Sequence, residues 1–457
     1  MFPQTTRVRG NQTERKQTMQ PQIICFVCGT CLTWSSPMLI KLNNMTDNPL
    51  HEIVPSSSTD SSLLGSLLTL GAIFGSCFFG VLSGKIGRKP VLLGLGVPFV
   101  ISFLMLAFCN KIGYFFFARA FSGFALGGVF SVIPMYTAEI SEKSNRGMLG
   151  AAVNCFLTLG LVTTDILGPY VPWMWYHIIM AIFPAVFIVL FFIFCPESPH
   201  YLVMKDIKKA EESLSTIRGT SDVKKELNEI KETVEKAQGG SFMDIFRSKG
   251  LRKAFLIGIG CIFFQQFSGI NVVLFYGQKV FEDVGGGMPS AFGPIIITGV
   301  QFTTSFITPI ALDRYGRKIL LIISHISMSV TQVFFGLYFF LKDNGTAVDN
   351  LGWLPISTLI LYTLAYNIGS GPIPWVLVGE LFPSSVKNLA ASGVTAVCWI
   401  WGFLITQEFQ TVVDAVHQGP TFWIFAAFSV VATLFVCFFV FETKGKSFQQ
   451  IQDELDS

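Results

Sequence analysis

Residues 262–281 read IFFQQFSGINVVLFYGQKVF. This apolar and aromatic run is about as long as a bilayer is thick, yet its middle holds four polar side chains: Gln265, Gln266, Ser268 and Asn271. An unpaired amide in an apolar medium costs about 2–7 kcal/mol, so these side chains need partners. We expect a membrane-spanning helix whose polar face lines a water-filled cavity and binds a neutral, polyhydroxylated ligand. The alternative role for such amides is hydrogen bonding to neighbouring helices.

Helical geometry predicts how this stretch presents its polar groups. Successive residues turn by about 100°, which puts Gln265 and Tyr276 on nearly the same face and leaves Asn271 off it. Gly269 follows a serine, and a helix can bend or unwind at such a pair. A break at Gly269 would bring Asn271 round toward the glutamines.

The composition places the whole chain in a membrane. Hydrophobic residues make up 51% and charged residues 13%, against about 25% charged in soluble proteins. The net charge of +3 is too small to indicate a nucleic-acid partner. The ten cysteines lie almost all in or beside apolar runs, so they indicate no disulfide framework. We predict no cofactor and no metal site.

Hydrophobic runs, each near the length needed to span a bilayer, recur along the chain at 22–40, 62–83, 91–109, 113–135, 148–170, 174–195, 254–281, 290–311, 319–341, 351–378, 389–410 and 420–441. The predicted fold is an all-α membrane protein of twelve transmembrane helices in two six-helix halves, with a short cytoplasmic helical segment between them. The predicted parts are an N-terminal tail (1–21), the first half (22–195), the linker helices (196–253), the second half (254–441) and a C-terminal tail (442–457).

The distribution of lysine and arginine predicts the orientation. Basic residues concentrate in alternate loops and in the segment 205–253, whereas the other loops hold little beyond Lys41, Lys111, Lys279 and Lys342. Because cytoplasmic loops are enriched in positive charge, we expect a multi-pass plasma-membrane protein with both termini cytoplasmic. The glycosylation sequons at Asn44 and Asn344 fall in loops assigned to the outside.

Three pairs of motifs recur at matching places in the two halves. They are 84–89 with 313–318, Glu139 and Arg146 with Glu380 and Lys387, and 196–198 with 442–444. Two six-span halves related by duplication are the plan of the major facilitator fold, in which the substrate site lies between the repeats.

These motifs, together with PMYTAEIS at 134–141, PESP at 196–199, QQFSGIN at 265–271 and GPIPW at 371–375, carry a family resemblance over residues 22–455. The chain resembles the sugar porter family of the major facilitator superfamily and, more loosely, its insect glucose and trehalose transporter-like branch. The resemblance implies a transporter that moves a neutral mono- or disaccharide, a hexose or trehalose, by alternating access, most simply as a monomer and by facilitated diffusion.

The resemblance also implies which residues bind the sugar. Gln265, Gln266 and Asn271 match the sugar-binding amides of the seventh span, Trp375 matches a tryptophan of the tenth span, and Trp399 matches one of the eleventh. Asn154 stands where the family has a glutamine, and Gln301 where many hexose carriers have an asparagine. We also expect the tenth span to be unwound between Gly369 and Pro374.

Charged residues in the cytoplasmic loops are expected to form gating ion pairs. The resemblance groups Arg88 with Glu139 and Arg146, and Asp313 and Arg317 with Glu380 and Lys387. Such clusters would join span ends while the cavity faces outward. Ordinary anchoring at the membrane edge is the alternative.

Two other functions remain open from sequence. A proton-coupled symporter needs an intramembrane acid; residues 22–40 contain none, and Asp165 lies toward the outer end of the fifth span, where we expect water to reach it. A non-transporting sugar sensor would be expected to carry a long signalling tail, whereas the sequence stops at Ser457. No arrangement of nucleophile, base and orienting acid indicates an enzyme.

Overall fold

The computed structural model describes residues 20–44, 47–54, 59–142, 146–237, 242–284, 289–346, 348–383, 385–446 and 448–456. Within these ranges the regular structure is helical, with one 3-10 turn, η1 (Asp349–Leu351). The predicted all-α fold is therefore confirmed.

The first half contains α2 (Gln22–Thr33), α3 (Ser35–Leu42), α4 (Thr59–Ile86), α5 (Arg88–Phe108), α6 (Ile112–Ile140), α7 (Arg146–Tyr170) and α8 (Trp173–Phe194). The second half contains α13 (Lys249–Gln266), α14 (Ile270–Val284), α15 (Phe292–Tyr315), α16 (Arg317–Asp343), α17 (Trp353–Ile368), α18 (Ile373–Leu381), α19 (Lys387–Val416) and α20 (Gln418–Phe439). Short helices α9 (Pro199–Val203), α10 (Ile207–Arg218), α11 (Lys224–Ala237) and α12 (Phe242–Arg247) connect the halves, and α21 (Phe448–Asp456) follows the second.

The predicted spans correspond to these helices, and three of them are broken. Among the described residues, ten helices are long and apolar enough to cross a membrane when α13 and α14 count as one. The pair α2 and α3, bent by 40°, gives an eleventh. The remaining predicted span, 351–378, is divided into α17 and α18, neither of which is long enough alone.

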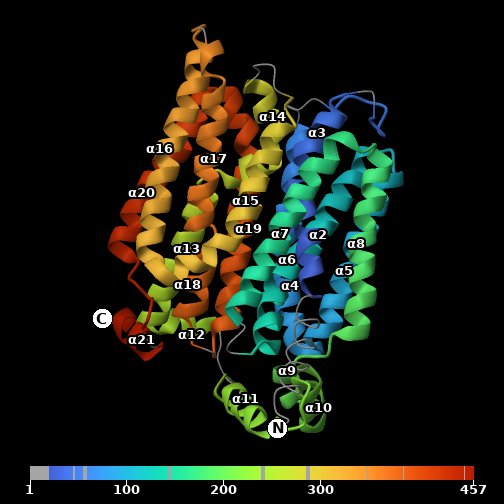
Figure 1. Cartoon of the computed structure of the whole chain (residues 1–457), viewed down its shortest axis with the longest axis vertical. Helices are drawn as coiled ribbons and strands as arrows, with labels where there is room; N and C mark the ends of the chain where they lie inside the picture. The colour runs from blue at the N-terminus through green and yellow to red at the C-terminus, as the bar shows by residue number, and fades with distance from the viewer. Residues whose placement is uncertain are drawn as a thin grey trace, which may run out of the picture.

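The two halves stand side by side, with the first half on the right of Figure 1 and the second on the left. Helices α9–α11 and α21 lie at the lower end of the bundle, which we call the linker end; α3 and the start of α4 mark the far end. The halves meet along α4 with α19 and α7 with α15, and at the far end α3 meets α14.

Apolar side chains cover the outside of the bundle. Phe438, Ile310 and Phe192 are 79%, 68% and 66% exposed, whereas many serines, threonines and glutamines are buried inside. A surface of this kind is stable against lipid tails and not against water.

Glycines bring α4 and α6 into backbone contact. A Cβ on Gly123 or Gly127 of α6 would collide with the carbonyls of Leu68 or Ala72 on α4. Small residues at such crossings let helix backbones approach closely, which supplies the packing that drives helix association in lipid. The first half is thus packed most closely where α4 crosses α6.

Candidate functional site

The predicted break at Gly269 is present. Helix α13 ends at Gln266, α14 begins at Ile270, and Gly269 has φ of +86°, a left-handed conformation that glycine adopts without a steric penalty. The break turns Asn271 toward Gln266, whose Oε1 accepts the Asn271 amide at 2.6 Å. The predicted approach of Asn271 to the glutamines is confirmed, although α14 no longer continues the face of α13 that would have aligned Gln265 with Tyr276.

Gln266 and Asn271 lie where the two halves meet. The Gln266 amide also donates to the sulfur of Cys398 on α19. On the same helix, Gly402 leaves room for Asn271, since a Cβ there would lie 3.2 Å from Nδ2 of Asn271 and 3.5 Å from Thr69 on α4 of the other half. Both residues are buried, at 5–6% exposed.

Gln265 has a different environment. Its Nε2 donates to the carbonyls of Ser370 and Gly371 at 2.8 and 2.6 Å. These carbonyls lie in the break between α17 and α18, where no helical N–H is available to them. Gln265 therefore joins the two broken spans at their breaks, as the helix-bridging interpretation of the amides requires.

At the α13–α14 break, the carbonyl of Ser268 also has side-chain partners. The Ser268 carbonyl accepts the Tyr362 hydroxyl at 3.0 Å and the Gln332 amide at 2.6 Å. Broken helices persist at membrane depth only where protein groups satisfy the freed backbone. Tyr362 and Gln332 do this here.

The remaining predicted binding residues lie on α7, α15, α18 and α19. Trp399 is 5% exposed and packs edge-on against Phe130 of the first half, with ring centroids 5.2 Å apart. Its indole Nε1 is buried without a hydrogen-bond partner among the described residues. Trp375, on α18, is half-buried in the core of the second half, Asn154 on α7 is half-buried, and Gln301 on α15 is 3% exposed.

Three of the hydrogen bonds between the halves lie toward the far end, and a fourth, from the Ser305 hydroxyl to the Cys155 sulfur at 3.1 Å, lies nearer the middle of α7 and α15. The Gln278 backbone N–H donates to Ser36 Oγ at 3.1 Å, and the Ser66 hydroxyl donates to the Gln407 side chain at 2.6 Å. Asp165, on α7, and Thr298, on α15, form a third contact between halves. The far end is closed in this structure, so the halves must separate there if a ligand is to enter from that side.

Asp165 differs from the expectation that water reaches it. It is 3% exposed. Although it lies close to the end of α7 in sequence, α15 of the opposite half covers it.

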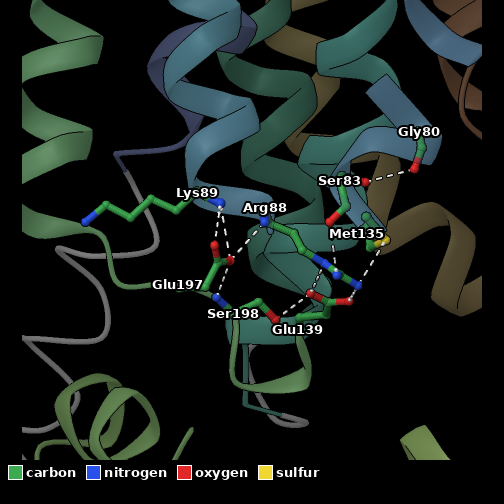
Figure 2. Close-up of polar contacts among 8 residues, drawn as sticks. All are labelled: Gly80, Ser83, Arg88, Lys89, Met135, Glu139, Glu197 and Ser198. Carbon is green, nitrogen blue, oxygen red and sulfur yellow. Dashed lines mark hydrogen bonds and ion pairs between the residues drawn. The ribbon is translucent and has the colours of Figure 1, made fainter. Parts of the chain in front are cut away.

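A cluster of ionic contacts lies at the linker end of the first half (Figure 2). Arg88 donates from Nε and Nη2 to the two carboxylate oxygens of Glu139 at 3.0 and 2.8 Å. The Glu197 carboxylate accepts the backbone N–H groups of Arg88 at 2.9 Å and Lys89 at 3.2 Å, and Ser198 donates its hydroxyl to Glu139 at 2.5 Å. This arrangement ties the start of α5 to the end of α6 and to the segment that follows α8.

The second half repeats this arrangement. Arg317 donates to Glu380 at 2.7 Å, the Glu442 carboxylate accepts the backbone N–H of Arg317 at 2.9 Å, and Thr443 donates to Glu380 at 2.6 Å. The glycines before the arginines, Gly87 and Gly316, have φ of +106° and +89°. A Cβ on either would collide with the neighbouring glutamate carboxylate.

The structure thus places four of the seven predicted gating residues in two equivalent pairs, each within one half. Lys387 is exposed at the start of α19, and the side chains of Arg146 and Asp313 lie outside the described residues. Glu197 and Glu442 were not predicted as members. Their signal in the sequence is the third repeated motif, since Glu197 lies in 196–198 and Glu442 in 442–444.

Twelve spans in two equivalent halves, with polar residues buried between them, define a multi-pass membrane transporter of the major facilitator fold. The sequence model of the family described as "Sugar (and other) transporter" matches residues 4–455. The chain belongs to this family.

Relatives and solved structures agree with this assignment. The chain is 35% identical to the facilitated trehalose transporter Tret1 of Bombyx mori, over 93% of this chain and 83% of that protein. It is 33% identical to Tret1 of Polypedilum vanderplanki, over 94% and 85%. The fold matches the proton:xylose symporter XylE bound to 6-bromo-6-deoxy-D-glucose with a TM-score of 0.80 at 24% identity, covering 98% of this chain and 100% of that one. A partially occluded inward open conformation of XylE from E. coli also matches, with a TM-score of 0.80 at 24% identity, over 95% and 100%.

Proposed function

We propose that this protein carries a neutral sugar, a hexose or trehalose, across the plasma membrane by alternating access, with no cofactor. The observation that carries the proposal is the pair of buried amides, Gln266 and Asn271, which lie at a helix break between the two halves and hydrogen-bond to each other. Uncharged donors and acceptors match the hydroxyls of a sugar, and separation of the halves frees them to bind it. The trehalose transporters among the relatives support this substrate class.

The proposed binding residues fall into two chemical groups. Gln266, Asn271, Asn154 and Gln301 supply amides for the hydroxyls, with Gln265 close by at the α17–α18 break. Trp399 and Trp375 offer flat indole faces to the C–H side of the sugar. The unpartnered Nε1 of Trp399 supports this assignment, because buried donors normally have partners in proteins.

Facilitated diffusion is the proposed mode. Helices α2 and α3 carry no aspartate or glutamate. Proton coupling usually requires an intramembrane acid linked to the substrate site, and the buried Asp165 contacts Thr298 and, among the described residues, none of the proposed binding amides. The ion-pair clusters around Arg88 and Arg317 are proposed to hold the linker ends of each half as rigid units during the transition.

Both termini and α9–α12 are proposed to be cytoplasmic. Asn44 and Asn344 are exposed and lie just after α3 and α16, whose ends lie at the far end, which then faces outward and is open to glycosylation. Tags at either terminus should react with antibody only in permeabilised cells, and labelling of a C-terminal tag on intact cells would reverse the topology. The protein is proposed to work as a monomer and to bind no nucleic acid.

Uptake of radiolabelled sugars in transport-deficient cells tests the function. The panel should include glucose, fructose, xylose and trehalose, with mannitol as a control for leakage. We expect at least one sugar to equilibrate across the membrane without accumulating. Accumulation that a protonophore abolishes would show symport instead.

A further inference from the structure

The Thr298 hydroxyl lies within hydrogen-bond distance of two oxygens, and its single proton cannot serve both if Asp165 is ionised. Thr298 Oγ1 lies 3.0 Å from Oδ2 of Asp165 and 2.8 Å from the carbonyl oxygen of Pro294. A hydroxyl has one proton, and an ionised carboxylate and a carbonyl can only accept. If the hydroxyl donates to the nearer Pro294 carbonyl, the second hydrogen bond needs a proton on Oδ2 of Asp165.

The surroundings of Asp165 offer an ionised carboxylate little compensation. Both Asp165 and Thr298 are at most 3% exposed, and Oδ1 of Asp165 is buried without a partner among the described residues. Burying a charge is costly unless it is paired and hydrogen-bonded, and such a group usually becomes neutral instead.

Several charged and titratable groups on the neighbouring helices have partners of their own, although Nη2 of Arg119 is buried without one among the described residues. The helices packed against α7 are α2, α3, α6, α8 and α15. Their charged and titratable residues are Cys25, Cys28 and Cys31 (α2), Lys41 (α3), Tyr114, Arg119, Tyr136 and Glu139 (α6), Tyr176 and His177 (α8), and Asp313, Arg314 and Tyr315 at the linker end of α15. Lys41 pairs with Asp47, Arg119 donates to the carbonyls of Leu64 and Cys31, and Tyr176 donates to Thr164. His177 accepts the indole N–H of Trp34 and faces the Trp173 carbonyl with its other nitrogen.

We propose that Asp165 is a proton-binding site that latches the far ends of α7 and α15 in the closed state. The protonated carboxyl donates to Thr298 Oγ1, and Thr298 donates to Pro294. When the far end opens, Asp165 meets water and releases its proton to the solution on that side. The proton must rebind before the halves close again.

This latch rests on the alternating access of the proposed function but is not a coupling mechanism. The proton leaves to and returns from the same side of the membrane. The pH on the far side therefore changes how readily that side opens, without driving sugar against its gradient.

A cysteine at the closed far end reports opening without requiring transport. Ser36 is 2% exposed and accepts a hydrogen bond from Gln278 of the other half, so Ser36→Cys becomes accessible only when the halves part. The full-length protein carries Ser36→Cys together with Cys109→Ser, since Cys109 is partly exposed at the far end, and is treated in cells with a membrane-impermeant thiol reagent. The same protein without Ser36→Cys gives the background.

The matched control is Asp165→Asn, which keeps the shape of the neutral acid but cannot titrate. At each pH, the labelling rate of the Ser36→Cys protein is divided by that of the same protein carrying Asp165→Asn. This ratio removes the pH dependence of the thiol itself. We expect a ratio near one at acidic pH and a several-fold rise between about pH 5.5 and 8, where ordinary aspartates stay ionised throughout. A flat ratio, or no labelling at any pH, overturns the proposal.

Thr298→Val provides the second variant. It removes the acceptor without changing the side-chain volume greatly, so labelling at acidic pH should increase several-fold over the protein with threonine. Unchanged labelling would show that the hydrogen bond does not hold the halves together. If the labelling behaves as expected while no sugar is taken up, the proposed function fails and the latch stands.

Discussion

Glu442 accepts the backbone N–H of Arg317 at 2.9 Å, although 125 positions separate the two residues in the chain. Glu197 makes the same contact with Arg88 in the first half. In each half, a carboxylate from the segment after the last span (α8 or α20) caps the N-terminus of the third span (α5 or α16). Free N–H groups and the helix dipole favour negative charge at that end. The equivalence links the sixth span of each half to its third by the same interaction.

The two capping glutamates should respond oppositely to pH. Burial acts to raise the pKa of Glu442, but the backbone N–H groups of Arg317, Lys444 and Lys318 outweigh it and leave that pKa lowered. Burial raises the pKa of Glu197 despite similar hydrogen bonds. A lowered pKa gives stability that is lost as the pH falls, and a raised pKa gives stability that is lost as the pH rises.

We therefore expect opposite trends for Glu442→Gln and Glu197→Gln in thermal unfolding of the purified protein between about pH 3 and 7.5, with the Glu442 effect below about pH 4.5 and the Glu197 effect above it. The deficit of Glu442→Gln relative to the parent should shrink toward acidic pH, as the parent loses its own contribution. The deficit of Glu197→Gln should shrink toward neutral pH. Trends of the same sign in both variants would contradict the assignment.

The ion pairs beside these glutamates should differ in their contribution to stability. Side chains of Arg88 and Glu139 are 7% and 12% exposed, against 16% and 27% for Arg317 and Glu380. Removing one partner of a buried pair costs about 3–5 kcal/mol, because the other charge stays buried. Glu139→Gln should thus lower the unfolding temperature more than Glu380→Gln.

A charge exchange provides the control for this comparison. Arg88→Glu combined with Glu139→Arg should recover part of the stability that each single change loses, since the two side chains face each other. An exchange no better than the single variants would indicate that the surrounding contacts, and not the pair, fix these residues.

Packing of α4 on α6 gives a prediction with a control in the same helix. Gly127→Ala would push a methyl group into the Ala72 backbone, and overpacking costs about 1–3 kcal/mol where the neighbour cannot move. Gly113 has nothing within 4 Å of the equivalent position, so Gly113→Ala should be neutral or slightly stabilising. Surface abundance should fall for Gly127→Ala alone. Equal abundance would show that the two helices can separate without cost.

Local sequence chemistry predicted the breaks that contain glycine or proline. Gly269 interrupts the seventh span, and the segment from Gly369 to Pro372 interrupts the tenth, because these residues adopt or impose backbone conformations that a helix cannot continue. The bend between α2 and α3 at Trp34 was not predicted, although Pro37 carried the signal, since it has no N–H for the Thr33 carbonyl and its ring clashes with that group. Tertiary contacts then fix Trp34 at the bend, where its indole donates to His177 at 2.7 Å and Arg119 lies 4.7 Å from its ring.

The partners of the buried amides could not be predicted from the sequence. Periodicity shows which residues share a face of one helix, but it cannot say which neighbouring helix meets that face. For this reason Gln265 and Gln266, adjacent in sequence and alike in chemistry, could not be separated. The structure gives Gln265 the carbonyls of the α17–α18 break and Gln266 a side-chain partner.

This difference predicts distinct phenotypes for two adjacent substitutions. Gln266→Leu removes hydrogen bonds to the sugar, each worth about 0.5–1.5 kcal/mol, and leaves a ligand hydroxyl unpaired at a further cost of about 1–3 kcal/mol. Affinity should fall about tenfold or more, because 1.4 kcal/mol is a factor of ten. Surface abundance should stay close to that of the parent.

Gln265→Leu should lower surface abundance in addition to affinity, since the carbonyls of Ser370 and Gly371 lose their donor. Uptake kinetics normalised to surface protein separate the two effects, and an unchanged half-saturating concentration in Gln266→Leu would remove that residue from the proposed sugar site.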